Sequence, residues 1–520
     1  MSPALTPEAR NLLPLAADGV LPPPPPVLPP KPGRNQACYC GSGKKFKQCC
    51  MERDAALRRQ QRVQAQPEWL LSSDRKLHQF LRYGWKVFDL PGLLGSLRDG
   101  RRDPTISTFH VVNSLFFAAV LRIPSLNALE GYLKEGDFQK LIGLTAQPGE
   151  KAFSADTISD MLDLCDVDSA RNALAELIRI AERNKVFRDG SYGGKRCVAI
   201  DAWEPHSSYE RHCPGCLTRQ LKGPDGGKRT QYYHRYVVAM LLGTDLDIIL
   251  AAEPVLSEEA LRDGEADHQG HEGELTAAYR LLDRLHNTYG RFIEIVITDA
   301  LYANGPWMTR LEQYGYGGII SLQKENNEPL KEAIDLCRRG ECQRQKHEDP
   351  DNRERVDFSD VDDIQTLSTY AGKVRVIQAE ITRFSPPASD PSKPSKPPRT
   401  STWCFALTGC ARRLSRPTAL KAMRSRWHIE NTAFHQWGSY WNLEHVYRHT
   451  PAALHALFLI WMLAFNLLQL FFYCRLGRER KPVQPRDVCD TLRHIVQVML
   501  RELAALPAPI PWQVPLQDSG

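Results

Sequence analysis

The sequence predicts an α/β fold, in which a mixed sheet with flanking helices carries a β-containing insertion and follows an all-helical region. Three observations support this prediction. Residues 74–187 have apolar side chains at helical spacing, without strand-like alternation. Residues 197–322 instead alternate short β-rich runs with amphipathic helical patterns. With 520 residues, the chain is also too long for one simple core, so several domains are expected.

The elements expected after residue 190 come in an order that predicts their topology. They are a strand at 197–200, strands at 232–242 and 247–255 joined by a hairpin turn, a helix at 272–289, a strand at 292–298, a helix at 306–314 and a strand at 317–322. This order is that of an RNase H-like sheet. In such a sheet the ends of the first and fourth strands are neighbours.

Composition divides the whole chain into segments. They are a Pro-rich disordered tail (1–32), a cysteine module (33–52), a helical region (53–190), the first part of the sheet-bearing core (191–322), a β-containing insertion with a Pro/Ser/Lys loop (323–416), the second part of the core (417–475) and a helical C-terminal tail (476–520). The insertion is expected to contain strands at 373–382 and 403–407.

Two further features bear on the location of the protein. The segment 452–473 is apolar and long enough to span a bilayer, but it contains His455, Asn466 and Gln469, so we expect a core helix. The fourteen cysteines, several of them closely spaced, fit reduced thiols and metal ligation better than a disulfide framework. Because the opening residues also lack a signal-peptide pattern, we expect a cytoplasmic protein without a membrane partner.

Three acidic residues carry the predicted chemistry. Asp201 and Asp299 each end an apolar strand, and Glu430 lies on a later helix. Carboxylates that converge from such positions need a hard cation, and two Mg²⁺ ions (or Mn²⁺) are the usual occupants. A paired-metal site of this kind performs phosphodiester chemistry. The alternative is that each acid is an ordinary helix cap, turn residue or ion-pair member.

Basic and aromatic residues near Glu430 suggest contacts with a polyanion. Residues 391–429 contain nine Lys or Arg and no acid, which suits binding of phosphates, although a solvated loop would look the same. Arg426 lies four residues before Glu430, on the same side of a helix. Trp437 continues that face and is either a stacking platform for a base or a core residue. The residues we assign to DNA contacts are Arg412, Arg413, Arg416, Lys421, Arg424 and Trp437.

The residues around the three acids resemble the acidic blocks of DDE-type insertion-sequence transposases. The blocks are Asp201-Ala202-Trp203-Glu204, Thr298-Asp299-Ala300-Leu301-Tyr302 and Arg426-Trp427-His428-Ile429-Glu430-Asn431. The resemblance implies an RNase H-like catalytic domain, Mg²⁺-dependent cleavage at transposon ends and strand transfer into target DNA by a homodimer. It assigns catalysis to Asp201, Asp299 and Glu430. Supporting roles fall to Arg426, Glu204, Tyr302 and Asn431.

Two cysteine clusters suggest zinc. Cys-x-Cys-x8-Cys-Cys is similar to the SEC-C zinc motif, and its four thiolates would form a closed tetrahedral site. Its ligands are Cys38, Cys40, Cys49 and Cys50. A weaker cluster after Asp201 is either a second zinc site or a metal-free turn. Its candidate ligands are His206, His212, Cys213 and Cys216.

Two other functions remain open at this stage. One is an RNase H-like nuclease that cuts without strand transfer. The other is a catalytically inactive, domesticated DNA-binding protein in which the acids are inert. An assay of cleavage and joining separates both from a transposase.

Overall fold

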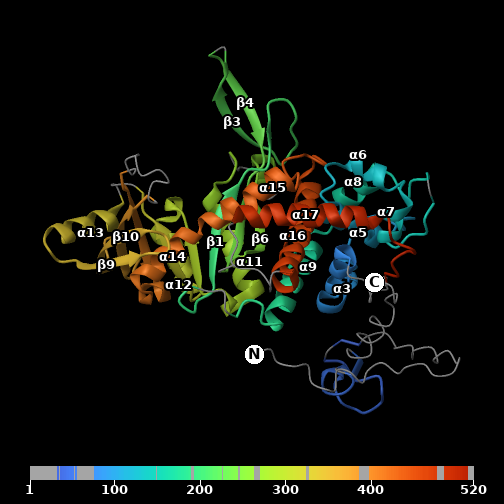
Figure 1. Ribbon diagram of the computed structural model, residues 1–520, viewed down its shortest axis with the longest axis horizontal. Helices are drawn as coiled ribbons and strands as arrows, with labels where there is room; N and C mark the ends of the chain where they lie inside the picture. Colours follow the sequence, from blue (N-terminus) through green and yellow to red (C-terminus); the bar gives the residue numbers. More distant parts are fainter. Residues whose placement is uncertain are drawn as a thin grey trace, which may run out of the picture. The chain divides into compact units, whose positions relative to one another are not determined.

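The computed structural model describes most of the chain. The described residues are 32–33, 35–51, 53–54, 75–147, 149–188, 192–224, 226–243, 246–262, 270–323, 327–385, 397–476 and 485–512. They belong to two compact units, 1–67 and 68–520 (Figure 1). The expected Pro-rich tail up to residue 31 and most of the expected Pro/Ser/Lys loop, 386–396, lie outside the described residues.

The second unit begins with the predicted all-helical region. Its helices are α3 (Lys76–Phe88), α4 (Leu90–Leu94), α5 (Thr108–Leu121), α6 (Leu126–Tyr132), α7 (Gly136–Leu141), α8 (Ala155–Asp163) and α9 (Val167–Arg183). Side-chain oxygens of Ser107 and Asp166 cap the first turns of α5 and α9, which fixes where these helices start. Helix α5 is buried on nearly all sides, as expected of a central helix.

A nine-stranded sheet follows, and five of its strands have the predicted RNase H-like order, β6-β5-β1-β7-β8. These strands are β1 (Cys197–Trp203), β5 (Tyr236–Leu242), β6 (Ile248–Pro254), β7 (Ile295–Thr298) and β8 (Gly317–Ser321). Strand β1 is antiparallel to β5 and parallel to β7. The helices α10 (Glu258–Arg262), α11 (Glu274–Tyr289) and α12 (Gly305–Gln313) connect the later strands, and α11 packs on β5 and β6.

The expectation of one strand over 232–242 is wrong. His234 and Arg235 belong to neither strand, and the two tyrosines before them end β4 (Lys228–Tyr233). Strand β4 pairs with β2 (Ser207–Ser208) and β3 (Leu217–Lys222) in a separate three-stranded sheet. The sequence did not reveal this sheet because its strands are polar and largely exposed. Figure 1 shows β3 and β4 as a ribbon that projects from the main sheet.

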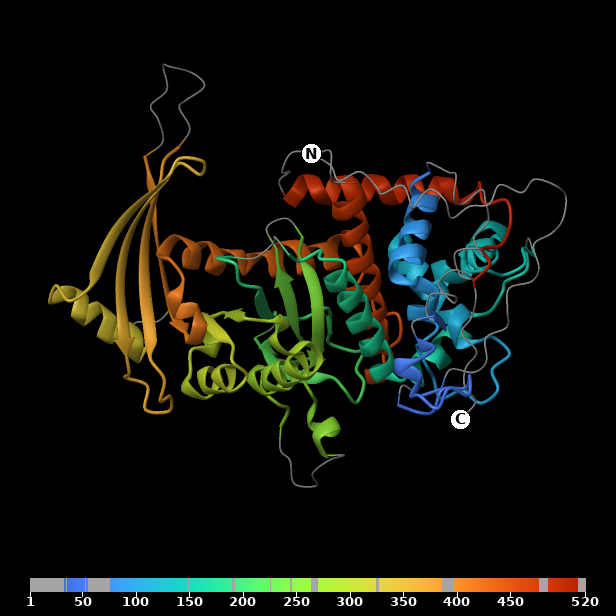
Figure 2. The ribbon, with the colours of Figure 1, turned by 90° about the horizontal axis from the view of Figure 1, so that it is seen from below.

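The β-containing insertion extends the main sheet instead of forming a sheet of its own. Its strands are β9 (Gln343–Asp349), β10 (Glu354–Ile364), β11 (Val374–Arg383) and β12 (Arg399–Thr408), and they continue the order as β8-β12-β11-β10-β9. Helix α13 (Glu328–Arg338) packs on β10 and β11 (Figure 2). The sequence predicted β11 and β12 but not β9 and β10, which are rich in charged residues.

The last helices return the chain to the centre of the unit. They are α14 (Arg416–Ser425), a π-helical turn (Ile429–Phe434), α15 (His435–Tyr440), α16 (Pro451–Phe471) and α17 (Pro485–Leu503). The apolar stretch Pro451–Leu476 is long enough to span a membrane, yet 89% of its most apolar window is buried inside the protein. Helix α16 packs on α5, α9 and β6, so it joins the helical region to the sheet as a core helix.

Candidate functional site

The sheet brings the two predicted aspartates together. Asp201 lies in β1, and Asp299 directly follows β7, its parallel neighbour. The paired register runs from Cys197 with Ile295 to Ala199 with Ile297, and Asp201 and Asp299 each stand two residues beyond its last pair, at the same end of the two strands. Asp299 also caps the short helix after β7, because its carboxylate accepts a hydrogen bond from the N–H of Leu301 at 2.9 Å.

Glu430 reaches Asp201 through a shared arginine. Nη1 of Arg426 lies 3.0 Å from Oε1 of Glu430, so the two side chains lie on one side of the helix, as predicted. The same guanidinium donates a hydrogen bond to the carboxylate of Asp201. Arg426 is only 8% exposed, whereas Glu430 is 34% exposed. A buried cation therefore joins the first and third of the predicted acids.

The environment of Asp201 disfavours its charged form. Burial raises the pKa of Asp201 to about 7, against an ordinary value of 3.8. The guanidinium of Arg426 and the N–H of Ala202 lower this pKa, while the carboxylates of Glu430 and Asp299 raise it. Both other acids are thus close enough to act on Asp201 electrostatically. Crowded carboxylates of this kind are typical of functional sites.

A fourth acid, Glu274, lies beside Asp299 and was not predicted. Its pKa is raised, mainly by burial, and the charge of Asp299 adds to the shift. The hydroxyl of Tyr302 donates to Glu274 at 3.1 Å, and Nη1 of Arg235 lies 3.6 Å from it. The predicted supporting residue Tyr302 is therefore buried and holds Glu274. In the sequence, Glu274 is only an acid at the start of an amphipathic helix, which is an ordinary position.

The other predicted supporting residues lie apart from this contact. Glu204 accepts hydrogen bonds from Arg219 at 2.6 and 2.9 Å and from Arg235 at 3.5 Å, so it anchors the three-stranded sheet. Asn431 is exposed on the π-helical turn.

One histidine holds the helix of Glu430 against the sheet. Nδ1 of His428 lies 3.3 Å from the carboxylate of Asp247, which precedes β6. The hydrogen bond to Asp247 raises the pKa of His428 above its ordinary value. Asp247 is nearly buried, and the ring of His428 gives its carboxylate a hydrogen-bond partner.

Several basic residues assigned to DNA form ion pairs inside the protein instead. Their partners are all acids of β10: Arg412 pairs with Asp362 and Asp363, Arg416 with Asp360, and Arg424 with Glu354. Asp360 and Glu354 are nearly buried, so these pairs attach the insertion to α14. The guanidinium groups of Arg412, Arg416 and Arg424 are thus already paired with carboxylates, and their assignment to DNA stays a prediction. Arg413 and Lys421 are exposed, and their assignment to DNA also stays a prediction.

Trp437 is a core residue, and its assignment to DNA is wrong. Its side chain is fully buried and packs edge-on against Trp203 and Phe458, with ring centroids 5.1 and 5.2 Å apart. Trp427, which the sequence reasoning passed over, is 44% exposed. It lies against the guanidinium of Arg426, 5.2 Å from the ring centroid. Trp427 is thus an accessible aromatic ring directly beside the acids.

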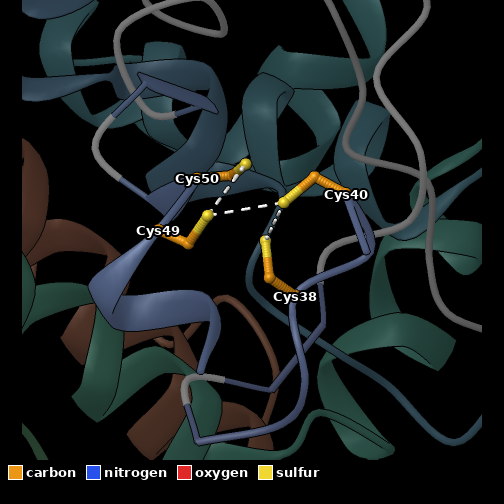
Figure 3. A group of neighbouring side chains, drawn as sticks. All are labelled: Cys38, Cys40, Cys49 and Cys50. Atoms are coloured by element: carbon orange, nitrogen blue, oxygen red, sulfur yellow. Dashed lines mark hydrogen bonds between the residues drawn. The ribbon is translucent and has the colours of Figure 1, made fainter. Parts of the chain in front are cut away.

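The first unit holds the predicted SEC-C cluster. One donor atom from each of the four cysteines lies within 4.8 Å of all the others (Figure 3). The Sγ of Cys40 lies 3.4 Å from those of Cys38 and Cys49, and the Sγ atoms of Cys49 and Cys50 are 3.8 Å apart. Phe46 fills the small core beneath them. Four sulfur atoms at these separations fit a tetrahedral metal.

The second cysteine cluster has different histidines from those predicted. Its donor atoms come from Cys213, Cys216, His234 and His449, again within 4.8 Å of one another. The choice of His206 and His212 is wrong. The ring of His212 stacks on Tyr232, 4.6 Å away. The ring of His206 packs against the rings of His234 and His449, with centroids 5.3 and 5.7 Å apart, and is not one of the four donors.

The acids suit a hard divalent cation. Asp201, Asp299 and Glu430 offer carboxylate oxygens, the donors that Mg²⁺ and Mn²⁺ prefer. The charge of these oxygens is compensated in part by Arg426, but the raised pKa of Asp201 indicates that more positive charge would be accommodated.

Comparison with known proteins confirms both resemblances drawn from the sequence. The profile described as "Transposase DDE domain" matches residues 264–467, and that of the SEC-C motif matches residues 34–52. The first match includes Asp299 and Glu430 and begins after Asp201. A solved synaptic complex of piggyBac transposase with hairpin DNA is similar at a TM-score of 0.39 and 12% identity, over 85% of this chain and 84% of that one. No curated protein matches the chain at a significant level.

Proposed function

We propose that this chain is a DNA transposase that cleaves DNA at transposon ends and transfers the cut strands into target DNA. Asp201, Asp299 and Glu430 would be its catalytic carboxylates. The observation that carries the proposal is their approach from three distant parts of the chain: two parallel strands in matching register and a helix tied to the first strand by Arg426. The match to the Transposase DDE domain supports it.

The three carboxylates would hold two Mg²⁺ or Mn²⁺ ions. When bound, such ions supply activation of the attacking oxygen and stabilisation of the leaving oxygen. The protein's own part is to keep the carboxylates close together and correctly oriented. Arg426 does this for Asp201 and Glu430, and Tyr302 and Arg235 hold Glu274 beside Asp299.

Exposed groups near the acids would bind the DNA. Arg413, just before α14, and Lys421, in the middle of α14, are exposed and can neutralise phosphates. Trp427 offers a ring on which an unpaired base can stack. The helical region 53–190, for its described part, would add DNA contacts of its own, and the four cysteines of the SEC-C cluster would hold Zn²⁺. Cutting and joining two DNA ends in concert implies a homodimer on the DNA.

The test is cleavage of the DNA that flanks the gene, with and without Mg²⁺. The intact protein is compared with Asp299→Ala and with the matched control Asp335→Ala, an exposed aspartate on α13 that pairs with the neighbouring Arg338. We expect cleavage and joining with the intact protein and the control. In Asp299→Ala the cleavage rate should fall by at least ~1,000-fold, because a carboxylate that would hold the metal is removed. DNA binding should be unchanged.

The outcomes distinguish the remaining functions. Cleavage without joined products would identify a nuclease. Tight DNA binding without any cleavage, alike in all three proteins, would overturn the catalytic proposal and favour a DNA-binding role.

A further inference from the structure

The second cysteine cluster gathers side chains from three distant places in the sequence. Cys213 and Cys216 lie in the loop between β2 and β3, and His234 lies between β4 and β5. His449 stands more than two hundred residues later, just before α16. None of these four residues is among the acids of the carboxylate site or the arginine that joins them. Their convergence therefore has to be explained separately from the proposed catalysis.

The separations between the donor atoms fit a tetrahedral zinc ion. With Zn–S near 2.3 Å and Zn–N near 2.0–2.1 Å, tetrahedral geometry sets S–S edges of about 3.8 Å and S–N edges of about 3.6 Å. The Sγ atoms of Cys213 and Cys216 are 3.8 Å apart, which is also far too long for a disulfide. Nε2 of His234 lies 3.3 Å from each sulfur, and Nε2 of His449 lies 3.4 Å from the Sγ of Cys216.

The backbone around the two cysteines is shaped to hold their sulfur atoms in place. The N–H of Cys216 donates to the carbonyl of Cys213 at 2.9 Å, which closes the turn Cys213-Pro214-Gly215-Cys216. The N–H of Cys213 lies 3.3 Å from the Sγ of Cys216, so a backbone dipole points at that sulfur. The hydroxyl of Ser257 donates to the carbonyl of Pro214 at 2.6 Å and fixes the turn from outside.

A glycine allows this turn to approach the fourth ligand. A Cβ on Gly215 would lie 2.7 Å from Cγ of Pro451, the first residue of α16, and 3.4 Å from Cε1 of His234. Only glycine therefore lets the turn pack directly on the start of α16, which follows His449 closely in the chain.

We propose that Cys213, Cys216, His234 and His449 form a second, structural zinc site, closed by four protein ligands. It clamps the three-stranded sheet to the N-terminus of the buried helix α16. The clamp also reaches the candidate catalytic site, because Arg235 directly follows His234 and contacts both Glu204 and Glu274. The inference does not depend on the proposed function, since the metal content of the protein can be measured without DNA.

The test measures zinc in the full chain purified without chelator, by elemental analysis per mole of protein. We expect about two zinc ions per chain, one for each cluster of four ligands. Serine substitution of all four cysteines of the SEC-C cluster should leave one, because that cluster belongs to the other compact unit. Adding Cys216→Ser should remove the last ion. His212→Ala, which changes an exposed histidine of the same loop, is the matched control and should retain it.

Two further measurements keep the result decisive if Cys216→Ser fails to fold. Co²⁺ substituted into the folded SEC-C variant should give the spectrum of a tetrahedral site with two thiolates. Chelation of the same variant should raise hydrogen exchange in residues 213–217 and 449–453 together, while strands β10 and β11 stay protected. A folded SEC-C variant without zinc, or one whose zinc survives Cys216→Ser and His449→Ala, would overturn the proposal.

Discussion

Replacement of Arg426 by glutamine tests the electrostatic arrangement on which the candidate catalytic site depends. The buried guanidinium pairs with both Asp201 and Glu430. Breaking a buried ion pair by removing one partner typically costs 3–5 kcal/mol, because an uncompensated charge stays behind. Since Glu430 is 34% exposed, water screens its charge, and we expect the lower end of that range, about 3 kcal/mol at pH 8.

The loss should depend on pH through Asp201. Its pKa is raised to about 7 in the folded protein from an ordinary 3.8, so the folded state holds this proton more tightly than the unfolded chain. The resulting stabilisation is complete below the ordinary pKa and is lost as the pH rises through about 7. Arg426→Gln removes a group that lowers this pKa. The variant should therefore lose the most unfolding free energy above pH 7, where Asp201 is charged, and less at pH 6, where Asp201 is protonated.

The assay is unfolding in EDTA at pH 6 and pH 8 of the intact protein, Arg426→Gln, Asp201→Asn and the double variant. At about 2.1 cal/mol/K per residue, the unit 68–520 has an unfolding entropy of roughly 1 kcal/mol/K, so ~3 kcal/mol corresponds to a Tm decrease of ~3 °C. In the Asp201→Asn background the decrease should be clearly smaller. The exposed pair of Arg338 gives the control, Arg338→Gln, with little change expected. If Arg426→Gln lowers the Tm equally at both pH values, and equally with Asp201 or Asn at position 201, the reasoning is refuted.

Three other predictions follow from the described contacts. Trp437→Ala should lower the free energy of unfolding by about 3–5 kcal/mol, because it empties a fully buried site. Trp427→Ala should leave unfolding unchanged and weaken single-stranded DNA binding by ~1–3 kcal/mol, and the reverse pattern would show that the wrong tryptophan was assigned to DNA. Asp360→Asn should cost about 3 kcal/mol, since it leaves the largely buried guanidinium of Arg375 without its carboxylate, and unfolding curves that match the intact protein would contradict this. Cys49→Ser should lower the zinc content by one ion and raise hydrogen exchange only within residues 35–54, and exchange that spreads into 68–520 would disprove the independence of the first unit.

The sheet order and the acids were predictable because their signals are local. Buried strands leave apolar runs, and an aspartate at the end of such a run stands at the edge of the sheet whatever the rest of the chain does. The parallel register of β1 and β7 then places Asp201 and Asp299 side by side. Arg426 and Glu430 needed only helical spacing to be placed together.

Contacts between distant segments could not be predicted in this way. His449 completes a cluster with Cys216 across 233 residues, and no spacing rule selects it over the nearer His206 and His212. The partners of the basic run before Glu430 were hidden for the same reason. It contains no acid, but the acids that pair with three of its arginines stand on β10, a strand that its charged sequence concealed.

The misplaced tryptophan has a different cause, which lies in the helix itself. In a regular α-helix Trp437 and Trp441, seven and eleven residues after Glu430, would share its side. The segment Ile429–Phe434 is instead a π-helical turn, in which the N–H of His435 donates to the carbonyl of Glu430, five residues back. The wider turn rotates the following side chains away from the side of Glu430. Glu430 thereby stays accessible while both tryptophans enter the core, so the same irregularity explains the failed prediction and keeps the carboxylate at the surface of the site.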